Sequence, residues 1–508
     1  MKSRTWMWMT VVFLFAALAM PVGMAAQENP SPDHKSKHHQ YKLIDLGTFG
    51  GPTSFVPSSS LVSINSQGTV IVEADTTIPD PYYPNCFQND CLVNHTGIWQ
   101  NGVLSDLGAL PGVNSAIPLW INDRGVVIGI SENSLIDPLA GFPETEAVVW
   151  KHGHIIDLGT LGGNASVANA VNNRGDVTGN ALNTILDPFE ASFGPPGYFF
   201  FPGATQMHAF LWRDGPMQDL GTLGGPDSVG EFVNERGQVA GVSYTSFMPN
   251  PGTGIPTQDP FLWDDGKMID LGTLGGTAGW PWGLNNRGQV TGQSNLADDV
   301  HYHAFLWDRG VLKDLGTLGG DKSSARWIND AGEVVGRAEL YPGLKNRHGF
   351  LWKKGVMTDL GILAGDTCAT AYAINSSEQI VGDSGNCGAI NRGFLWENGG
   401  PIVDLQTLVL PGSDLTISET NYINDAGEIS GFGTNSNGDQ RALLLIPCDE
   451  KHPGVCGDYS MIDAPTQQTS PSTTTKWGSE SPADTANPLR NRFGRGFHIP
   501  GQPFAPSD

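Results

Sequence analysis

Four histidines stand eleven residues before an aspartate in a recurring phrase, and these pairs are the first residues whose types could do chemistry. The phrase is clearest in HAFLWRDGPMQDLGTLGG (208–225) and HAFLWDRGVLKDLGTLGG (303–320). An imidazole beside a carboxylate is a common general-base or metal-binding pair. The pairs are His95 with Asp106, His208 with Asp219, His303 with Asp314, and His348 with Asp359. In other copies Glu146, Asp259, Arg392 and Arg441 take the place of the histidine.

The repetition of these pairs favours a structural role. One catalytic site per molecule is sufficient, whereas a feature that recurs in many repeats is expected to stabilise each repeat. If the strands on either side form a tight hairpin, His208 stands opposite Asp219 and Trp212 opposite Gly215. The pair would then form a hydrogen bond across the ladder. We interpret the pairs as structural.

The alternative hypothesis is an extracellular polysaccharide-degrading enzyme. Its catalytic carboxylates would have to come from the longer loops. Its candidate carboxylates are Asp137, Glu144, Glu146, Asp187 and Glu190. The chain has no Gly-x-Ser-x-Gly elbow, no His-Glu-x-x-His helix and no calcium loop of alternating acids. The sequence therefore assigns no catalytic, cofactor-binding or metal-binding residue, and a noncatalytic protein is the preferred interpretation.

The elements that carry these residues repeat about every fifty residues along the chain. Each copy has an asparagine phrase and, in seven copies, a tryptophan at the end of an apolar run. The tryptophans are Trp99, Trp150, Trp212, Trp263, Trp307, Trp352 and Trp396. The asparagines are Asn65, Asn122, Asn172, Asn234, Asn285, Asn329, Asn375 and Asn424. Glycines follow three and seven residues after most of these asparagines, and the lapses at Val72 and Glu378 suggest turns that tolerate substitution.

Four short apolar runs in each copy predict four antiparallel strands, which is the composition of a propeller blade. In the sixth copy they read SARWIN, EVVG, HGFLW and VMTDLG. The last copy lacks a fourth run, and residues 41–47 (YKLIDLG) match the missing one. We therefore predict an all-β, closed eight-bladed β-propeller over residues 41–449, in which the N-terminal strand completes the last blade. An open solenoid would instead be expected to end in polar capping repeats.

These phrases resemble the HAF-repeat family of bacterial extracellular proteins, named after the tripeptide found here at His208-Ala209-Phe210 and His303-Ala304-Phe305. The resemblance covers about residues 41–447. It implies export and a repeat architecture, and it implies no activity and no catalytic residue.

The termini and the composition indicate export. Lys2 and Arg4 precede an apolar run and a small-residue segment, so residues 1–26 are predicted to be a cleaved signal peptide. Residues 27–40 are expected to be flexible and polar, and residues 450–508 a disordered polar tail. No later segment is long and apolar enough to span a membrane. The net charge of −24 argues against nucleic acid as a partner, and we expect a secreted or periplasmic monomer without a cofactor.

The six cysteines fall in three close pairs within loop-like segments. In an exported protein such pairs predict local disulfides. The pairs are Cys86 with Cys91, Cys368 with Cys387, and Cys448 with Cys456. A metal site is the alternative, although no pair has the spacing of a structural zinc site.

Long connections between the second and third strands of the first four copies predict a variable binding face. One of them carries the aromatic residues Phe193, Tyr198, Phe199, Phe200 and Phe201. They could pack over the channel mouth or stack on a carbohydrate. We expect a secreted binding or scaffold module for a glycan or a cell-surface protein, with a structural envelope or adhesion protein as a further alternative.

Overall fold

The computed structural model describes residues 37–57, 62–83, 86–88, 90–137, 143–189, 205–344, 346–387, 391–456 and 461–463. Within these ranges the protein is built of β-strands, with one 3₁₀ helix, η1 (Leu405–Leu408). The predicted signal peptide, Glu190 and the loop aromatics Phe193, Tyr198, Phe199, Phe200 and Phe201 lie outside the described residues.

The strands form antiparallel sheets of four, each made largely from consecutive strands. The sheets of the first half are made of β3 (Gly50–Phe55), β4 (Val70–Pro79), β5 (Leu92–Gln100) and β6 (Val103–Gly108); β7 (Ala116–Ile121), β8 (Val127–Ile136), β9 (Pro143–Lys151) and β10 (His154–Asp157); β11 (Ser166–Val171), β12 (Val177–Leu186), β13 (Thr205–Trp212) and β14 (Gln218–Gly221); β15 (Ser228–Val233), β16 (Val239–Tyr244), β17 (Gln258–Asp264) and β18 (Lys267–Asp270).

The second half of the chain continues the same pattern. Its sheets are made of β19 (Gly275–Leu284), β20 (Val290–Leu296), β21 (Tyr302–Asp308) and β22 (Val311–Gly316); β23 (Ser323–Ile328), β24 (Val334–Glu339), β25 (Arg347–Lys353) and β26 (Val356–Gly361); β27 (Cys368–Ile374), β28 (Ile380–Gly385), β29 (Asn391–Trp396) and β30 (Val403–Asp404); β31 (Thr416–Ile423), β32 (Ile429–Thr434) and β33 (Gln440–Pro447) with β2 (Tyr41–Asp45). A single parallel bridge between Gln258 and Ala278 links β17 to β19.

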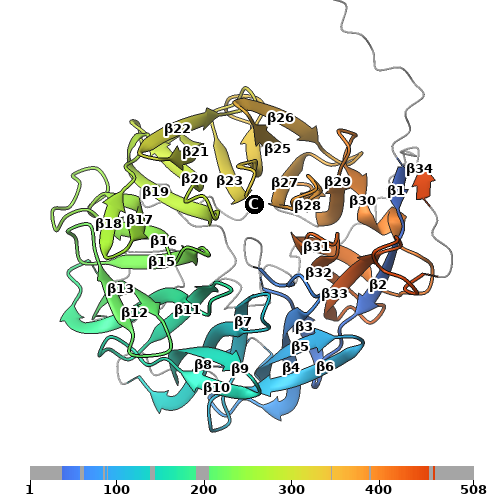
Figure 1. The fold of residues 1–508 in the computed structure, drawn as a ribbon, viewed down its shortest axis with the longest axis horizontal. Helices are drawn as coiled ribbons and strands as arrows, with labels where there is room; N and C mark the ends of the chain where they lie inside the picture. The colour runs from blue at the N-terminus through green and yellow to red at the C-terminus, as the bar shows by residue number, and fades with distance from the viewer. Residues whose placement is uncertain are drawn as a thin grey trace, which may run out of the picture.

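The sheets lie side by side around a central axis, with strands such as β7, β15, β23 and β31 nearest the centre and β10, β22 and β26 at the periphery (Figure 1). This is a β-propeller-like fold, so the predicted all-β class and the four-stranded antiparallel unit are confirmed. The strand at residues 41–45 pairs with β33 from the other end of the chain, from Tyr41 with Pro447 to Asp45 with Leu443.

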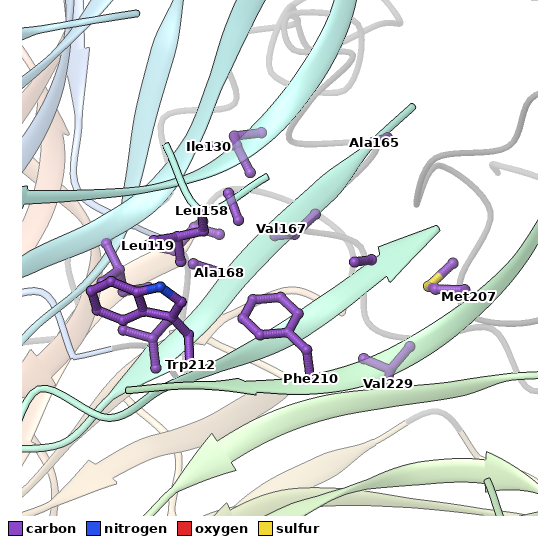
Figure 2. Close-up of a cluster of buried hydrophobic side chains, with 14 of the residues drawn as sticks. Leu119, Ile130, Leu158, Ala165, Val167, Ala168, Met207, Phe210, Trp212 and Val229 are labelled. Carbon is purple, nitrogen blue, oxygen red and sulfur yellow. The ribbon is translucent and has the colours of Figure 1, made fainter. Parts of the chain in front are cut away.

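The hydrophobic core lies between neighbouring sheets. Figure 2 shows Phe210 and Trp212 of β13 among Leu119 of β7, Val167 of β11 and Val229 of β15, so that one cluster joins several sheets. All seven repeated tryptophans are between 3% and 8% exposed, as expected for side chains packed between sheets. Burying an aromatic side chain of this size contributes about 1.5–3 kcal/mol, which is a sufficient reason for its recurrence.

The second glycine of the asparagine phrase lies inside the second strand of a sheet and not in a turn, contrary to the sequence interpretation. A Cβ atom on Gly129 would stand 2.0 Å from the carbonyl oxygen of Ile117, and one on Gly292 would stand 1.9 Å from that of Trp280. The first strand of each of these two sheets carries a β-bulge beside the glycine. The bulge brings the backbones together, and only glycine fits there.

The hairpin register also differs from the predicted one. Asp314 stands opposite Phe305, not opposite His303, because β21 and β22 are joined by the two-residue turn Arg309-Gly310. Both turn residues have positive φ, as a tight hairpin requires. In the same register Asp219 stands opposite Phe210, so the predicted pairing of Trp212 with Gly215 is also wrong.

Two short strands lie in segments that were predicted to be unstructured. β1 (Lys37–His39) pairs with β34 (Met461–Asp463) in antiparallel register. His38 is fully buried, and its Nδ1 lies 2.8 Å from Oε1 of Glu397. The prediction of a flexible segment at 27–40 and a disordered tail at 450–508 missed this pairing, because three-residue strands leave no periodic pattern.

Candidate functional site

The repeated asparagines begin tight turns at the inner ends of the sheets. Oδ1 of Asn285 accepts hydrogen bonds from the backbone N–H groups of Arg287 at 3.1 Å and Gln289 at 3.0 Å. This side-chain-to-backbone pattern stabilises a turn without a helix or strand partner. Gly288 supplies the positive φ of the turn.

The other half of each asparagine amide links one sheet to the next. Nδ2 donates to the backbone carbonyl of the next repeated asparagine along the chain, at 2.7–3.3 Å. The donors in order are Asn65, Asn122, Asn172, Asn234, Asn285, Asn329 and Asn375. Nδ2 of Asn424 donates to the carbonyl of Asn65 at 2.9 Å. Asparagine suits this position because its short amide carries an acceptor for the turn and a donor for the next sheet.

A second set of hydrogen bonds runs through the residues that follow the asparagines. The backbone N–H of Ser66 donates to Oδ1 of Asp123 at 2.9 Å, and that of Asp123 donates to Oδ1 of Asn173 at 2.8 Å. The N–H of Asn173 donates in turn to Oε1 of Glu235 at 2.8 Å. These residues form a polar rim, defined here as Ser66, Asp123, Asn173, Glu235, Asn286, Asp330, Ser376 and Asp425.

Inside the rim lies an axial pocket of about 360 Å³. Its wall is formed by the apolar residues that precede the asparagines, including Ile121, Leu284 and Ile423. Its floor is formed by four aromatic side chains that stand two positions before a repeated asparagine. They are Trp120, Phe232, Trp327 and Tyr422. The ring centroids of Trp120 and Trp327 lie 6.1 Å apart, so side chains from different sheets meet over the axis.

The floor is continuous because each aromatic ring touches another. Trp120 and Phe232 have centroids 6.3 Å apart, and Trp327 and Tyr422 lie 5.4 Å apart, both in edge-to-face geometry. Such contacts are a favourable arrangement of aromatic rings. They hold the floor of the pocket in a defined shape.

Bulky and small residues alternate from one repeat to the next around this pocket. The repeats that supply a floor aromatic also supply the rim acids Asp123, Glu235, Asp330 and Asp425. The intervening repeats place a small residue two positions before the asparagine and Ser or Asn after it; these small residues are Ser63, Ala170, Gly283 and Ala373. Four aromatic rings thus fill a space that eight would overcrowd.

The rim of the pocket carries four carboxylates, those of Asp123, Glu235, Asp330 and Asp425. Partial burial alone would raise the pKa of Asp123, but hydrogen bonds from Ser66 and Asn173 lower it and keep the group ionised. Burial is the main cause of the raised pKa of Tyr422, and the charges of Asp425, Asp123 and Asp330 raise it further. The negative charges of the polar rim therefore act on Tyr422 in the floor of the pocket.

The predicted histidine–aspartate hydrogen bonds are present. Nδ1 of His303 lies 2.8 Å from Asp314, and equivalent bonds join His95 with Asp106, His208 with Asp219, and His348 with Asp359. Each aspartate also accepts from the N–H group two residues later, such as that of Gly316. Partial burial would raise the pKa of Asp314, but these hydrogen bonds lower it. The pairs recur at the sheet margins, away from the axial pocket, and stabilise the hairpins.

Substitution of one such histidine should have a small effect on stability. We expect His303→Gln to reduce the free energy of unfolding by at most about 1 kcal/mol, because the pair is partly exposed to solvent. Because the pKa of Asp314 is lower in the folded protein than in the unfolded chain, the pair stabilises the fold at pH values above the unfolded pKa. This stabilisation is lost as the pH falls, so the effect of the substitution should be smaller in acid. Urea unfolding at neutral and acidic pH measures this, with the exposed His154→Gln as control. A loss of several kcal/mol would contradict a local role.

Two of the loop acids proposed for the enzyme hypothesis, Glu144 and Glu146, meet at Asn133, and Asp137 makes a separate contact. Asp137 bonds to Asn164 of the following sheet, and Glu146 accepts from Asn133 at 3.2 Å and from Ser166 at 3.2 Å. Burial, and next the charge of Asp157, raises the pKa of Glu146 to about 7. Glu144 lies 3.5 Å from the same Asn133.

Asp187 belongs to a recurring Asp-Pro motif at the end of the second strand, seen also at Asp80 and Asp137. It lies beside the buried Asp227, whose pKa is raised to about 8 by burial and next by the charge of Asp187. One carboxyl group of such a pair is protonated, which lets it donate to the other. The recurrence of the motif in three repeats favours a structural role for it.

The three predicted disulfides are formed. Their Cα–Cα distances are 5.2 Å for Cys86–Cys91, 5.2 Å for Cys368–Cys387 and 5.5 Å for Cys448–Cys456. Among the described residues, no group of three or more His, Cys, Asp or Glu side chains is placed to hold a metal ion. Within the same ranges no helix is long and apolar enough to span a bilayer.

The chain has been compared with protein families, curated proteins and solved structures. No family model and no curated protein matches it. TolB from Acinetobacter baumannii is 11% identical over 63% of this chain and 79% of its own, with a TM-score of 0.30. A gluconolactonase from Xanthomonas campestris is 10% identical over 81% of this chain and 100% of its own, with a TM-score of 0.28. A mutant of the Aleuria aurantia lectin is 10% identical over 85% and 99%, with a TM-score of 0.26. Similarities of this size carry no inference about this chain.

Proposed function

We propose that this protein is an exported, noncatalytic binding module of the HAF-repeat type, which holds a basic group in its axial pocket. The observation that carries the proposal is the pocket itself, because repeats along the whole chain contribute to its wall, its aromatic floor and its acidic rim. A volume of about 360 Å³ lies within the range of small-molecule sites.

The proposal includes a closed ring of eight blades. Its support is the hydrogen bond from Asn424 to Asn65, which continues the series of asparagine links from the last repeat to the first. The pairing of β2 with β33 supports it independently, since it joins the two ends of the chain in one sheet. Export is supported by the N-terminal sequence and by the three disulfides.

The chemistry of the pocket favours a cation. The faces of Trp and Tyr rings attract ammonium and guanidinium groups, and the rim carboxylates add Coulomb attraction. None of the lining residues is Lys or Arg. The second carboxylate oxygens of Glu235 and Asp425 have no hydrogen-bond partner among the described residues, so they are available to a ligand. A Lys or Arg side chain of a cell-surface protein fits this site.

Binding is tested with choline and with an arginine-containing tripeptide on the purified mature chain, by calorimetry and tryptophan fluorescence. We expect Asp425→Asn and Glu235→Gln each to weaken binding about fivefold, which corresponds to about 1 kcal/mol for an exposed charge. Each variant keeps the oxygen that accepts the backbone N–H. Asp214→Asn, a hairpin-turn acid with a side chain 71% exposed, makes the same charge change away from the pocket and should have no effect.

The alternative functions are separated in the same experiment. A polysaccharide array with detection of new reducing ends is run beside the cation titrations. Release of reducing ends would contradict a noncatalytic role. Glycan binding that neither rim variant weakens would show that the binding site lies outside the axial pocket.

A further inference from the structure

Three arginines gather on one face of the sheet formed by β23–β26. Arg326 lies at the bulge of β23, Arg337 on β24 and Arg347 on β25. Arg347 pairs with Glu339 and Arg337 pairs with Gly349, so the two arginines point to the same side of the sheet on a diagonal. Arg337 and Arg347 lie toward the β24–β25 connection, whereas Arg326 adjoins Trp327 of the pocket floor and is three residues from Asn329.

The guanidinium groups of this cluster are incompletely paired. Arg326 is only 6% exposed, and the Nε atoms of Arg326 and Arg347 have no hydrogen-bond partner. Within the described ranges none of the three arginines forms an ion pair. Burial of an unpaired charge is strongly unfavourable. This is the more unusual in a chain whose net charge is −24.

The charges of the cluster oppose one another. Burial, and next the charge of Arg337, lowers the pKa of Arg326 to about 9. The charge of Arg337 is the main cause that lowers the pKa of Arg347 to about 10, followed by burial. Arg326 and Arg347 therefore remain protonated at neutral pH and are ready to be neutralised by an anion.

Aromatic rings surround the cluster. The Arg326 guanidinium lies 4.5 Å from the ring centroid of Trp282, and Nζ of Lys322 lies 5.4 Å from that of Tyr302. Tyr372 is within electrostatic range of Arg326 and Arg337.

Three carboxylates lie nearby. Glu339 is the cross-strand partner of Arg347, and the charge of Lys322 also acts on it. Asp383 and Glu419 act on the Tyr372 hydroxyl, and Asp383 accepts from the backbone of Thr420 at 3.2 Å. Of these three, Glu339 acts directly on Arg347.

We propose that the arginine cluster, defined as Arg326, Arg337 and Arg347 with Lys322, is a second binding site that takes an oxyanion, the carboxylate or sulfate of an acidic saccharide. Guanidinium groups bind such anions through parallel N–H···O hydrogen bonds. The rings of Trp282, Tyr302 and Tyr372 supply apolar faces beside the charge. This site shares no residue with the axial pocket, although Arg326 adjoins Trp327 of its floor, and it carries the opposite charge.

The test is titration of the mature full-length chain with a galacturonate tetrasaccharide, a sulfated disaccharide and inorganic sulfate, followed by calorimetry and thermal unfolding. We expect the saccharides to bind and raise the melting temperature, and Arg347→Gln to weaken this binding at least tenfold. Arg309→Gln, whose side chain is 87% exposed in a neighbouring hairpin turn, should bind as the parent does. Asp425→Asn should also bind these anions normally, which separates this site from the proposed axial one.

A second variant distinguishes a ligand site from a structural arginine. Arg326→Met removes the unpaired buried charge, so the free protein should melt higher than the parent while anion-dependent stabilisation is lost. A lower melting temperature without anion would show that the guanidinium is paired in the free protein and would overturn the proposal. Equal effects of sulfate and of the saccharides would restrict the site to a simple anion, and no response of the parent to any of the three would also overturn it.

Discussion

A disulfide across the seam between β2 and β33 should stabilise the protein far more than a disulfide within a hairpin. Lys42 and Ile446 are Cα partners in this ladder. Directly opposed residues of antiparallel strands are 4.5–5.5 Å apart, which a disulfide spans without backbone movement. Lys42→Cys with Ile446→Cys would close a loop of roughly 400 residues, and the chain-entropy model then gives up to about 6 kcal/mol.

The matched control is Gln100→Cys with Val103→Cys, which are partners in the β5–β6 hairpin. This bridge closes a loop of about four residues, for which the same model gives about 2 kcal/mol. Urea unfolding of both oxidised proteins, beside the parent and the single-cysteine variants, measures the difference. A seam disulfide that stabilises no more than the hairpin disulfide would show that the ends of the chain do not meet in one sheet, and the proposed closed ring would fail with it.

Features that lie within one repeat could be predicted from the sequence. The four-stranded unit, the buried tryptophans and the histidine–aspartate bonds follow from short patterns that recur with constant spacing. Each copy is an independent observation of the same local structure. The three disulfides were predictable for a related reason, because their cysteines are close in sequence and export favours oxidation.

Features that depend on an extra residue in a strand were not predictable. A bulge shifts the register by one residue but leaves the composition of the strand unchanged. The glycine at 129 was therefore assigned to a turn, although it lies against the carbonyl of Ile117 beside a bulge. The hairpin register was wrong for a different reason, because the two-residue β21–β22 turn consists of Arg309 and Gly310 and places Asp314 opposite Phe305 instead of His303. Only the paired strand shows why these positions are constrained.

The axial pocket left a signal in the sequence that becomes meaningful only when the sheets surround a common axis. Aromatic residues stand two positions before every second repeated asparagine, and small residues stand before the others. Along a linear chain this alternation has no consequence, whereas around an axis it brings Trp120 and Trp327 together. The arginine cluster left no such signal, because its members lie on three strands and meet only through the sheet register.

Replacement of Asn424 by aspartate should destabilise the protein strongly, and the loss should depend on pH. Nδ2 of Asn424 donates to the carbonyl of Asn65 at 2.9 Å and to Oε2 of Glu428 at 2.6 Å. Asn424→Asp keeps the acceptor oxygen of the turn but sets a carboxylate against Glu428, which is 8% exposed. An unpaired charge in a buried network costs about 3–5 kcal/mol.

The pH dependence of this loss follows from the sign of the new interaction. The like charge of Glu428 would raise the folded-state pKa of an aspartate at 424 above its unfolded value of about 3.9. The loss should therefore be smallest below pH 4, where a protonated aspartate can replace only one of the two donated hydrogen bonds, and grow as the pH rises through the folded pKa. Asn375→Asp is the matched control, because Nδ2 of Asn375 donates to the neutral Gln379 at 2.8 Å and to the carbonyl of Asn424 at 3.0 Å. It should lose less than half as much, with little dependence on pH. Equal losses in urea unfolding of both variants would mean that Glu428 plays no part, and no loss in either would mean that the asparagine links do not hold the inner strands together.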